Sequence, residues 1–220
     1  MSAQGNFELA AWMILWGSLL DKLDGSIARL FNATSSFGVE FDSFADFVAF
    51  GIAPAALIYY RLQETGRFVG TGKIALMVVA GLYVLALAIR LARFNITTGG
   101  DETMFCGIPG TLMGAFLAAG YLTHSTYKLP AALLEYAPAY LLIGAALMIS
   151  NVRLPKLKPR KNKLMNVFQF GNVAAAYVFG PLRMFPGYLF GLATLYLLGG
   201  VVWALFHPEA DSGHEEQLAT

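Results

Sequence analysis

Long apolar segments dominate the chain, and short polar, glycine-rich or proline-rich breaks separate them. A helix needs about 20 mostly apolar residues to cross the hydrocarbon core of a bilayer. Seven segments approach this length and character, at residues 8–31, 38–62, 73–93, 105–124, 130–150, 166–183 and 186–206. The pattern therefore predicts an all-α fold, a polytopic transmembrane helix bundle with about seven spans in this chain.

The apolar pattern is weakest near the carboxyl end of the chain. Gln169, Asn172 and Pro181 interrupt the sixth segment, and residues 207–220 are mostly polar. Polar chain ends without an apolar face usually stay outside the packed structure. We therefore expect one transmembrane domain over residues 1–206, followed by a polar C-terminal tail over residues 207–220.

Composition agrees with a lipid environment. Hydrophobic residues make up 57% of the chain and charged residues 13%, whereas a soluble domain usually carries about a quarter charged residues. The net charge of +1 gives no strong field that would attract nucleic acid. The single cysteine, Cys106, excludes an intrachain disulfide and a cysteine-built metal site. We expect an integral, multi-pass protein that contacts membrane lipid and no nucleic acid.

Basic residues in the predicted loops indicate an orientation. Cytoplasmic loops of membrane proteins carry an excess of lysine and arginine. The segment 153–163 holds six basic residues, more than any other predicted loop. Counting the spans back from it places Arg90, Arg93 and the loop after residue 31 on the same, cytoplasmic side.

Acidic residues concentrate where they are most costly. Of 14 acidic residues, five lie between Asp21 and Asp46, inside the first two predicted spans. A charge at that depth costs about 2.5–3.5 kcal/mol on insertion scales unless it is paired or bound to a metal. Asp21 and Asp24 share one helix face, as do Asp42 and Asp46 on the next helix. Two antiparallel helices with a short connection can bring the four carboxylates together.

Converging carboxylates repel one another and favour a bound cation. Oxygen ligands alone suit magnesium, manganese or calcium better than zinc or copper, and four aspartates can hold two ions for phosphoryl chemistry. Gly25 and Ala28 leave room beside the carboxylates for a diphosphate or a base, and Arg29 can pair with phosphate. Two alternatives stay open: structural ion pairs with neighbouring basic residues, and a transit site in a divalent-cation transporter.

The stretch from Asp21 to Asp46 matches one pattern in full: D-x2-D-G-x2-A-R-x8-G-x3-D-x3-D. This pattern resembles the signature of the CDP-alcohol phosphatidyltransferase family. The resemblance implies that Asp21, Asp24, Asp42 and Asp46 ligate two divalent ions, Mg²⁺ or Mn²⁺, and that Asp46 is also the catalytic general base. It further implies a nucleotide pocket and a homodimer. The pocket residues it implies are Gly25, Ala28, Arg29 and Gly38.

Wider segments of the chain are most like the phosphatidylserine synthase branch of this family. They are residues 32–55, the run Arg90-Leu-Ala-Arg-Phe-Asn95, and the run Phe105-Cys-Gly-Ile-Pro-Gly110. This likeness implies CDP-diacylglycerol and L-serine as substrates, with phosphatidylserine and CMP as products. The alternative is the same chemistry with another acceptor, glycerol 3-phosphate or inositol phosphate.

The acceptor site is predicted at the cytoplasmic end of the third span. Free serine carries a carboxylate, which an arginine can bind through paired hydrogen bonds. We expect Arg93, together with Asn95, to contact the acceptor, the alternative for Arg93 being a membrane anchor. One difference from the family is a hydrophobic helix that usually precedes the signature helix, and we expect this first helix to be missing from the chain.

Overall fold

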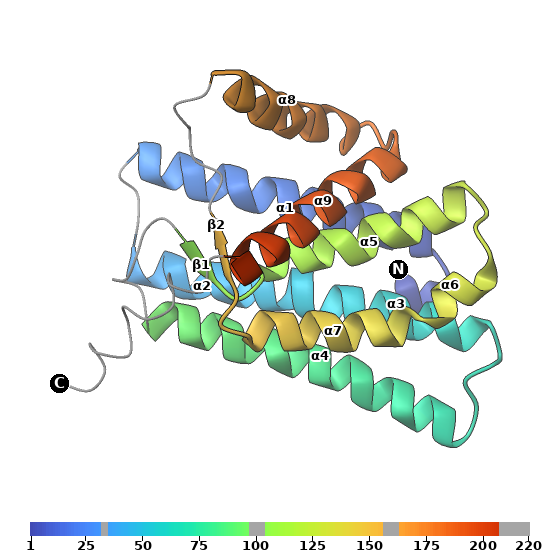
Figure 1. The fold of residues 1–220 in the computed structure, drawn as a ribbon. Coiled ribbons are helices and arrows are strands. Elements are labelled where there is room, and N and C mark those ends of the chain that lie inside the picture. The colour runs from blue at the N-terminus through green and yellow to red at the C-terminus, as the bar shows by residue number, and fades with distance from the viewer. Residues whose placement is uncertain (32–34, 97–103, 156–162, 207–220) are drawn as a thin grey trace.

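The computed structural model describes residues 1–31, 35–96, 104–155 and 163–206, and it forms a bundle of helices (Figure 1). The predicted tail, residues 207–220, lies outside the described residues, as do residues 156–162 of the basic segment. The main elements are α1 (Phe7–Leu30), α2 (Ser36–Asp46), η2 (Phe47–Ile52), α3 (Ala53–Glu64), α4 (Thr71–Ile96), β1 (Met104–Cys106), α5 (Gly110–Thr126), α6 (Ala131–Glu135), α7 (Ala137–Ile149), β2 (Arg153–Pro155), α8 (Lys163–Phe179) and α9 (Pro186–Phe206), after a short 3₁₀ turn, η1 (Ser2–Gln4).

The predicted all-α membrane bundle is confirmed. Among the described residues, three helices are long and apolar enough to cross a membrane: Ser36–Glu64, Thr71–Ile96 and Pro186–Ala204. Helix α1 has 24 residues, enough for about 36 Å at 1.5 Å per residue, but charged residues interrupt its apolar character. Within the described residues, the structure adds to this helical bundle two short strands, β1 and β2, that the sequence did not predict.

The predicted span at 105–124 begins too early. Residues 104–106 form β1, which pairs antiparallel with β2, and Cys106 lies opposite Arg153. Gly107 then turns the chain with φ of 73°, and Pro109 keeps an extended backbone as the N-cap of α5. Because proline has no N–H and suits the start of a helix, the helix begins only at Gly110.

The predicted span at 130–150 is divided. Its first residues form α6, and α7 follows after Tyr136, whose ψ of −2° departs from a regular helix. Pro138 is the second residue of α7, where its missing N–H is tolerated but a continuous helix through it is not. The segment therefore becomes a short helix and a longer one rather than a single span.

The second predicted span is continuous but not uniform. Directly after Asp46 the helix widens into the π-helical turn η2, and Pro54 follows at the start of α3. Pro54 cannot donate to the carbonyl of Phe50 four residues before it. The buried Tyr83 of α4 donates its hydroxyl to that carbonyl instead, at 2.9 Å. This bond joins the second and third predicted spans close to Asp46.

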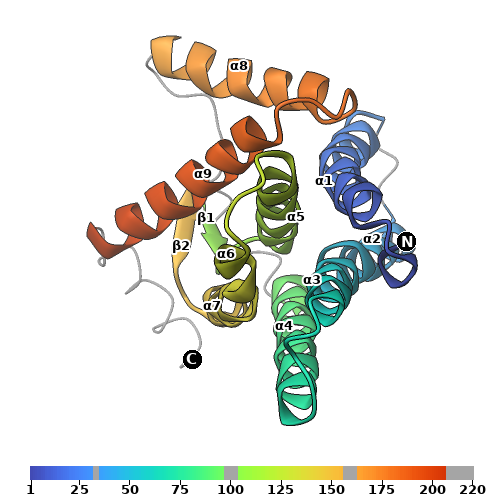
Figure 2. The same cartoon turned by 90° about the vertical axis from the view of Figure 1, so that its right-hand side faces the viewer.

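Helix α5 lies in the middle of the bundle, with α1 and α9 beside it (Figure 2). Gly114 permits a close approach between α5 and η2, because a Cβ there would lie 3.3 Å from the Cα of Phe50. Helix α8 lies at the edge of the bundle. It is held to α1 by the Tyr177 hydroxyl, which donates to the Leu19 carbonyl at 2.9 Å.

We expect Gly107→Ala to destabilise the fold by about 2 kcal/mol or more, since its positive φ disfavours any side chain. A Cβ there would also lie 2.3 Å from the Met148 carbonyl oxygen. Thermal unfolding of the purified protein measures this effect. Gly81→Ala is the matched control, because a Cβ at Gly81 has no neighbour within 4 Å. Equal unfolding midpoints for the two variants would contradict the account of this turn.

Candidate functional site

Three of the four predicted aspartates form one cluster between α1 and α2. Asp21 and Asp24 lie one turn apart on α1, and Asp42 reaches them from α2. One carboxylate oxygen from each residue lies within 4.8 Å of the others. Asp21 is partly buried, whereas Asp24 and Asp42 are exposed. The helical periodicity used in the sequence prediction thus brings these carboxylates together.

The fourth aspartate lies beside this cluster. Asp46 is the last residue of α2, and its partly buried side chain lies beside that of Asp21. It also interacts electrostatically with Asp42 and with Arg90 of α4. The arrangement places Asp46 deeper than Asp24, where α2 changes into the π-helical turn.

Two supporting residues were not among the predicted site residues. Arg90, with 7% of its surface exposed, is the single buried charged side chain among the described residues. Thr111, in the first turn of α5, has its hydroxyl 3.5 Å from a carboxylate oxygen of Asp21. A charge inside an apolar segment was a usable signal for Arg90. Nothing in the sequence marks Thr111, because its role depends on how α5 packs on α1.

The predicted nucleotide-binding residues lie along the same two helices. Gly25 directly follows Asp24, and its N–H is 2.6 Å from the Asp24 carboxylate. Gly38 lies in the first turn of α2, where its N–H donates to the Ser35 hydroxyl at 3.0 Å. Ala28 and Arg29 belong to α1, one turn beyond Gly25, and their side chains are outside the described part of the structure. The backbone therefore places all four near the aspartates.

The predicted acceptor residues both have protein partners. Arg93 donates to the carbonyls of Ile149 and Ser150 at 3.0 and 3.1 Å, at the carboxyl end of α7. Asn95 exchanges hydrogen bonds with Ser43, the neighbour of Asp42, at 3.2–3.3 Å. Both residues therefore tie α4 to its neighbours at the aspartate end of the bundle, and their contact with an acceptor stays a prediction.

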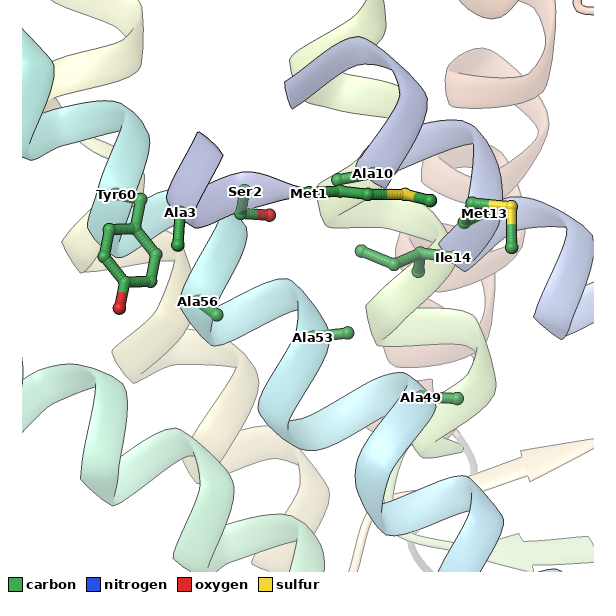
Figure 3. Close-up of a pocket in the computed structure, with 10 residues that line it drawn as sticks. All are labelled: Met1, Ser2, Ala3, Ala10, Met13, Ile14, Ala49, Ala53, Ala56 and Tyr60. Carbon is green, nitrogen blue, oxygen red and sulfur yellow. The ribbon is translucent and has the colours of Figure 1, made fainter. Parts of the chain in front are cut away.

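A separate apolar cavity of about 490 Å³ lies between the first half of α1 and the α3 region (Figure 3). Alanines from both sides line it, among them Ala10, Ala49 and Ala53, with Tyr60 at one end. None of its lining residues carries a carboxylate. Phosphoryl chemistry needs charged groups, so the aspartate cluster is the candidate site.

The aspartate cluster fits a divalent cation. Oxygen atoms from three carboxylates at this separation suit a hard cation such as Mg²⁺ or Mn²⁺, which removes their mutual repulsion. Asp46 adds a fourth carboxylate beside Asp21. Such a site can bind a diphosphate through the cation and leave one carboxylate to accept a proton.

Comparison with known proteins identifies the family. Residues 1–154 match the family model described as CDP-alcohol phosphatidyltransferase. A CDP-diacylglycerol–serine O-phosphatidyltransferase of Helicobacter pylori is 36% identical over 205 residues, covering 91% of this chain and 81% of that protein. The Bacillus subtilis protein of the same name is 34% identical, covering 70% of this chain and 78% of its own length. An archaetidylserine synthase of Methanothermobacter thermautotrophicus is 33% identical over 71% of this chain.

The matched region contains the complete aspartate signature, the turn before α5 and the supporting helix α4. Its length exceeds half of the 220-residue chain, and similarity to the Helicobacter protein continues over nearly all of it. This chain belongs to the CDP-alcohol phosphatidyltransferase family.

Proposed function

We propose that this chain is a CDP-diacylglycerol–serine O-phosphatidyltransferase, which makes phosphatidylserine and CMP. The observation that carries the proposal is the aspartate cluster, in which the family signature brings three carboxylates within 4.8 Å. The choice of serine rests on the relatives described above, whose names all denote serine phospholipid synthesis. The names of these relatives therefore favour serine over glycerol 3-phosphate or inositol phosphate as the acceptor.

In the proposed reaction the serine hydroxyl oxygen attacks the phosphorus that carries the diacylglycerol. Asp46 accepts the hydroxyl proton as the new P–O bond forms. The bond between this phosphorus and the oxygen bridging it to the CMP phosphate breaks, and CMP leaves with the bonding electrons. A base in the chain is needed because serine is a poor nucleophile until its proton is transferred. The partly buried position of Asp46 next to Asp21 supports this role.

Asp21, Asp24, Asp42 and Asp46 are the residues that would hold two divalent ions, Mg²⁺ or Mn²⁺. When bound, such ions neutralise the diphosphate and stabilise the charge that develops on the leaving oxygen. Thr111 supports the orientation of Asp21 through its hydroxyl. Helix α5 therefore contributes to the site although it carries none of the signature residues.

The nucleotide is proposed to lie along α1 and α2. Gly25, Ala28 and Gly38 are small, so they permit the cytidine and its diphosphate to approach the helix backbone. Arg29 supplies a guanidinium for phosphate oxygens. Their position within about one turn of the aspartates supports a pocket that continues directly from the cation site.

We propose that the aspartate end of the bundle faces the cytoplasm. Strand β2 begins at Arg153 and helix α8 begins at Lys163, and the basic segment 153–163 joins these two elements in the sequence. Strand β2 and the start of α8 both lie at the aspartate end of the bundle (Figure 1). The positive-inside rule then supports this orientation. A homodimer is also proposed, because the family resemblance favours one.

Purified protein given CDP-diacylglycerol and Mn²⁺ is expected to release CMP with serine and not with glycerol 3-phosphate or inositol phosphate. Asp46→Asn should lower this rate at least about 100-fold, because the general base is lost. Glu135→Gln, a carboxylate that pairs with Arg67 away from the aspartates, is the control and should keep activity. Release with a different alcohol would retain the reaction class and refute serine as the acceptor.

Metal binding is expected to raise the thermal unfolding midpoint, since a ligand that binds only the folded state stabilises it. CDP should add to this effect only when Mn²⁺ or Mg²⁺ is present. Asp24→Asn should weaken metal binding about tenfold or more, whereas Glu40→Gln, on α2 but outside the cluster, should not. Stabilisation by metal with no response to CDP would favour the transporter alternative.

Arg93→Ala tests the acceptor contact. If Arg93 binds the serine carboxylate, the variant should raise the KM for serine about tenfold or more and change the KM for CDP-diacylglycerol little. Loss of the bonds to Ile149 and Ser150 would instead lower the unfolding midpoint at an unchanged serine KM. The second result would assign Arg93 a structural role. Asn151→Ala, which removes another partner of Arg93, is the matched control.

A further inference from the structure

A polar pocket of about 620 Å³ lies at the end of the bundle opposite the aspartates. The stretch of α1 between Glu8 and Asp21 is about 20 Å long, so the two regions are well separated. The volume is within the range of small-ligand sites, about 300–1,000 Å³. Its lining includes Glu8, Arg61, Glu64 and Arg183, together with the aromatic residue Phe7.

Two arginines and two glutamates give this pocket balanced charge. Arg61 lies 3.4 Å from Glu64, and Glu8 accepts a hydrogen bond from Ser125 at 2.6 Å. Arg183 has no carboxylate partner within the part of the chain that the structure describes. Its guanidinium therefore has N–H groups available for an anionic group. A pocket with both signs of charge suits a zwitterion better than a simple anion.

Aromatic rings hold both arginines in position. The guanidinium carbon of Arg61 lies 5.8 Å from the centre of the Phe7 ring, and that of Arg183 lies 4.8 Å from the centre of the Trp16 ring. Cation–π contacts of this kind engage the face of the guanidinium. Its N–H groups point outward from the edge and remain able to donate to phosphate oxygens.

The turn that carries Arg183 is built with unusual backbone geometry. Arg183 and Phe185 both have positive φ, 54° and 50°, although neither is glycine. Such conformations cost about 1–3 kcal/mol each and are found preferentially at functional sites. The Trp16 indole N–H donates to the Gly180 carbonyl at 2.9 Å and fixes this turn against α1. Two of the three non-glycine residues with positive φ in the described part of the chain therefore belong to the turn that presents Arg183 to the pocket.

The pocket lies at the ends of two helical segments that are long and apolar enough to cross a membrane. The apolar span Ser36–Glu64 ends at Glu64, and the span Pro186–Ala204 begins three residues after Arg183. Charged residues at the ends of spans face the interface between the hydrocarbon core and water.

We propose that this pocket binds the headgroup of an aminophospholipid from the leaflet opposite the aspartate site. Arg61 and Arg183 receive the phosphate, and Glu8 and Glu64 receive the ammonium group. The balanced charge selects a headgroup with both groups over one that carries phosphate alone. This binding site does not depend on the proposed reaction, because none of its residues belongs to the aspartate cluster.

Native mass spectrometry of the full chain in detergent tests the proposal, with phosphatidylethanolamine and phosphatidylglycerol of matched acyl chains as probes. The wild-type protein is expected to bind phosphatidylethanolamine at least about tenfold more tightly than phosphatidylglycerol. The double variant Arg61→Gln/Arg183→Gln should weaken phosphatidylethanolamine binding at least about tenfold, because two charged donors to phosphate are lost. Glu8→Gln/Glu64→Gln should abolish the preference between the two lipids.

Arg67→Gln is the matched control, because Arg67 is an exposed arginine on the same side of the bundle and outside the pocket lining; it should leave lipid binding unchanged. An unfolding midpoint close to that of the wild-type protein confirms that each variant is folded. Equal affinity for the two lipids in the wild-type protein would overturn the aminophospholipid assignment. Unchanged binding by the arginine double variant, or equally tight binding of free O-phosphoethanolamine, would overturn the lipid site.

Discussion

The repulsion among carboxylates gathered between α1 and α2 is the constraint on which the rest of the structure depends. Like charges this close are unfavourable in any medium and more so beside the apolar segments of a membrane protein. A cation removes the conflict only when the helices hold the ligand oxygens in place beforehand. The main packing contacts near the site, from α4 and α5, can be understood as the means of holding α1 and α2 in this arrangement.

Helices α5 and α4 each interact with a different aspartate of the site. Helix α5 reaches Asp21 through Thr111, and its close packing on η2 at Gly114 fixes the segment just beyond Asp46. Helix α4 contributes the buried Arg90 near Asp46, and its Tyr83 satisfies the carbonyl that Pro54 leaves without a donor. The π-helical turn after Asp46 is therefore held from two sides. Such turns occur often at functional sites because they redirect side chains within an otherwise regular helix.

The sequence was sufficient for features that depend on local periodicity. The spacing of Asp21, Asp24 and Asp42 on two helices predicted a cluster that the structure contains, because residues three or four apart share a helix face. Features that depend on distant contacts were not predictable. The strand β1 exists because residues almost 50 positions later pair with it, and Thr111 meets Asp21 only through the packing of α5 on α1. Hydrophobicity alone predicted a helix over residues 105–109. The positive φ of Gly107 and the extended backbone of Pro109 instead delay the helix to Gly110.

Helix α1 connects two polar regions of opposite character. Its carboxyl-terminal half supplies Asp21 and Asp24 to the carboxylate cluster, so this end suits a cation. Its amino-terminal end borders a pocket in which arginine and glutamate are balanced, so that end suits a zwitterion. The apolar stretch between them, including Ala11 and Ile14, is buried in the core. A lipid bound at the amino-terminal end would therefore stabilise the same helix that supplies Asp21 and Asp24, without contacting the reacting groups.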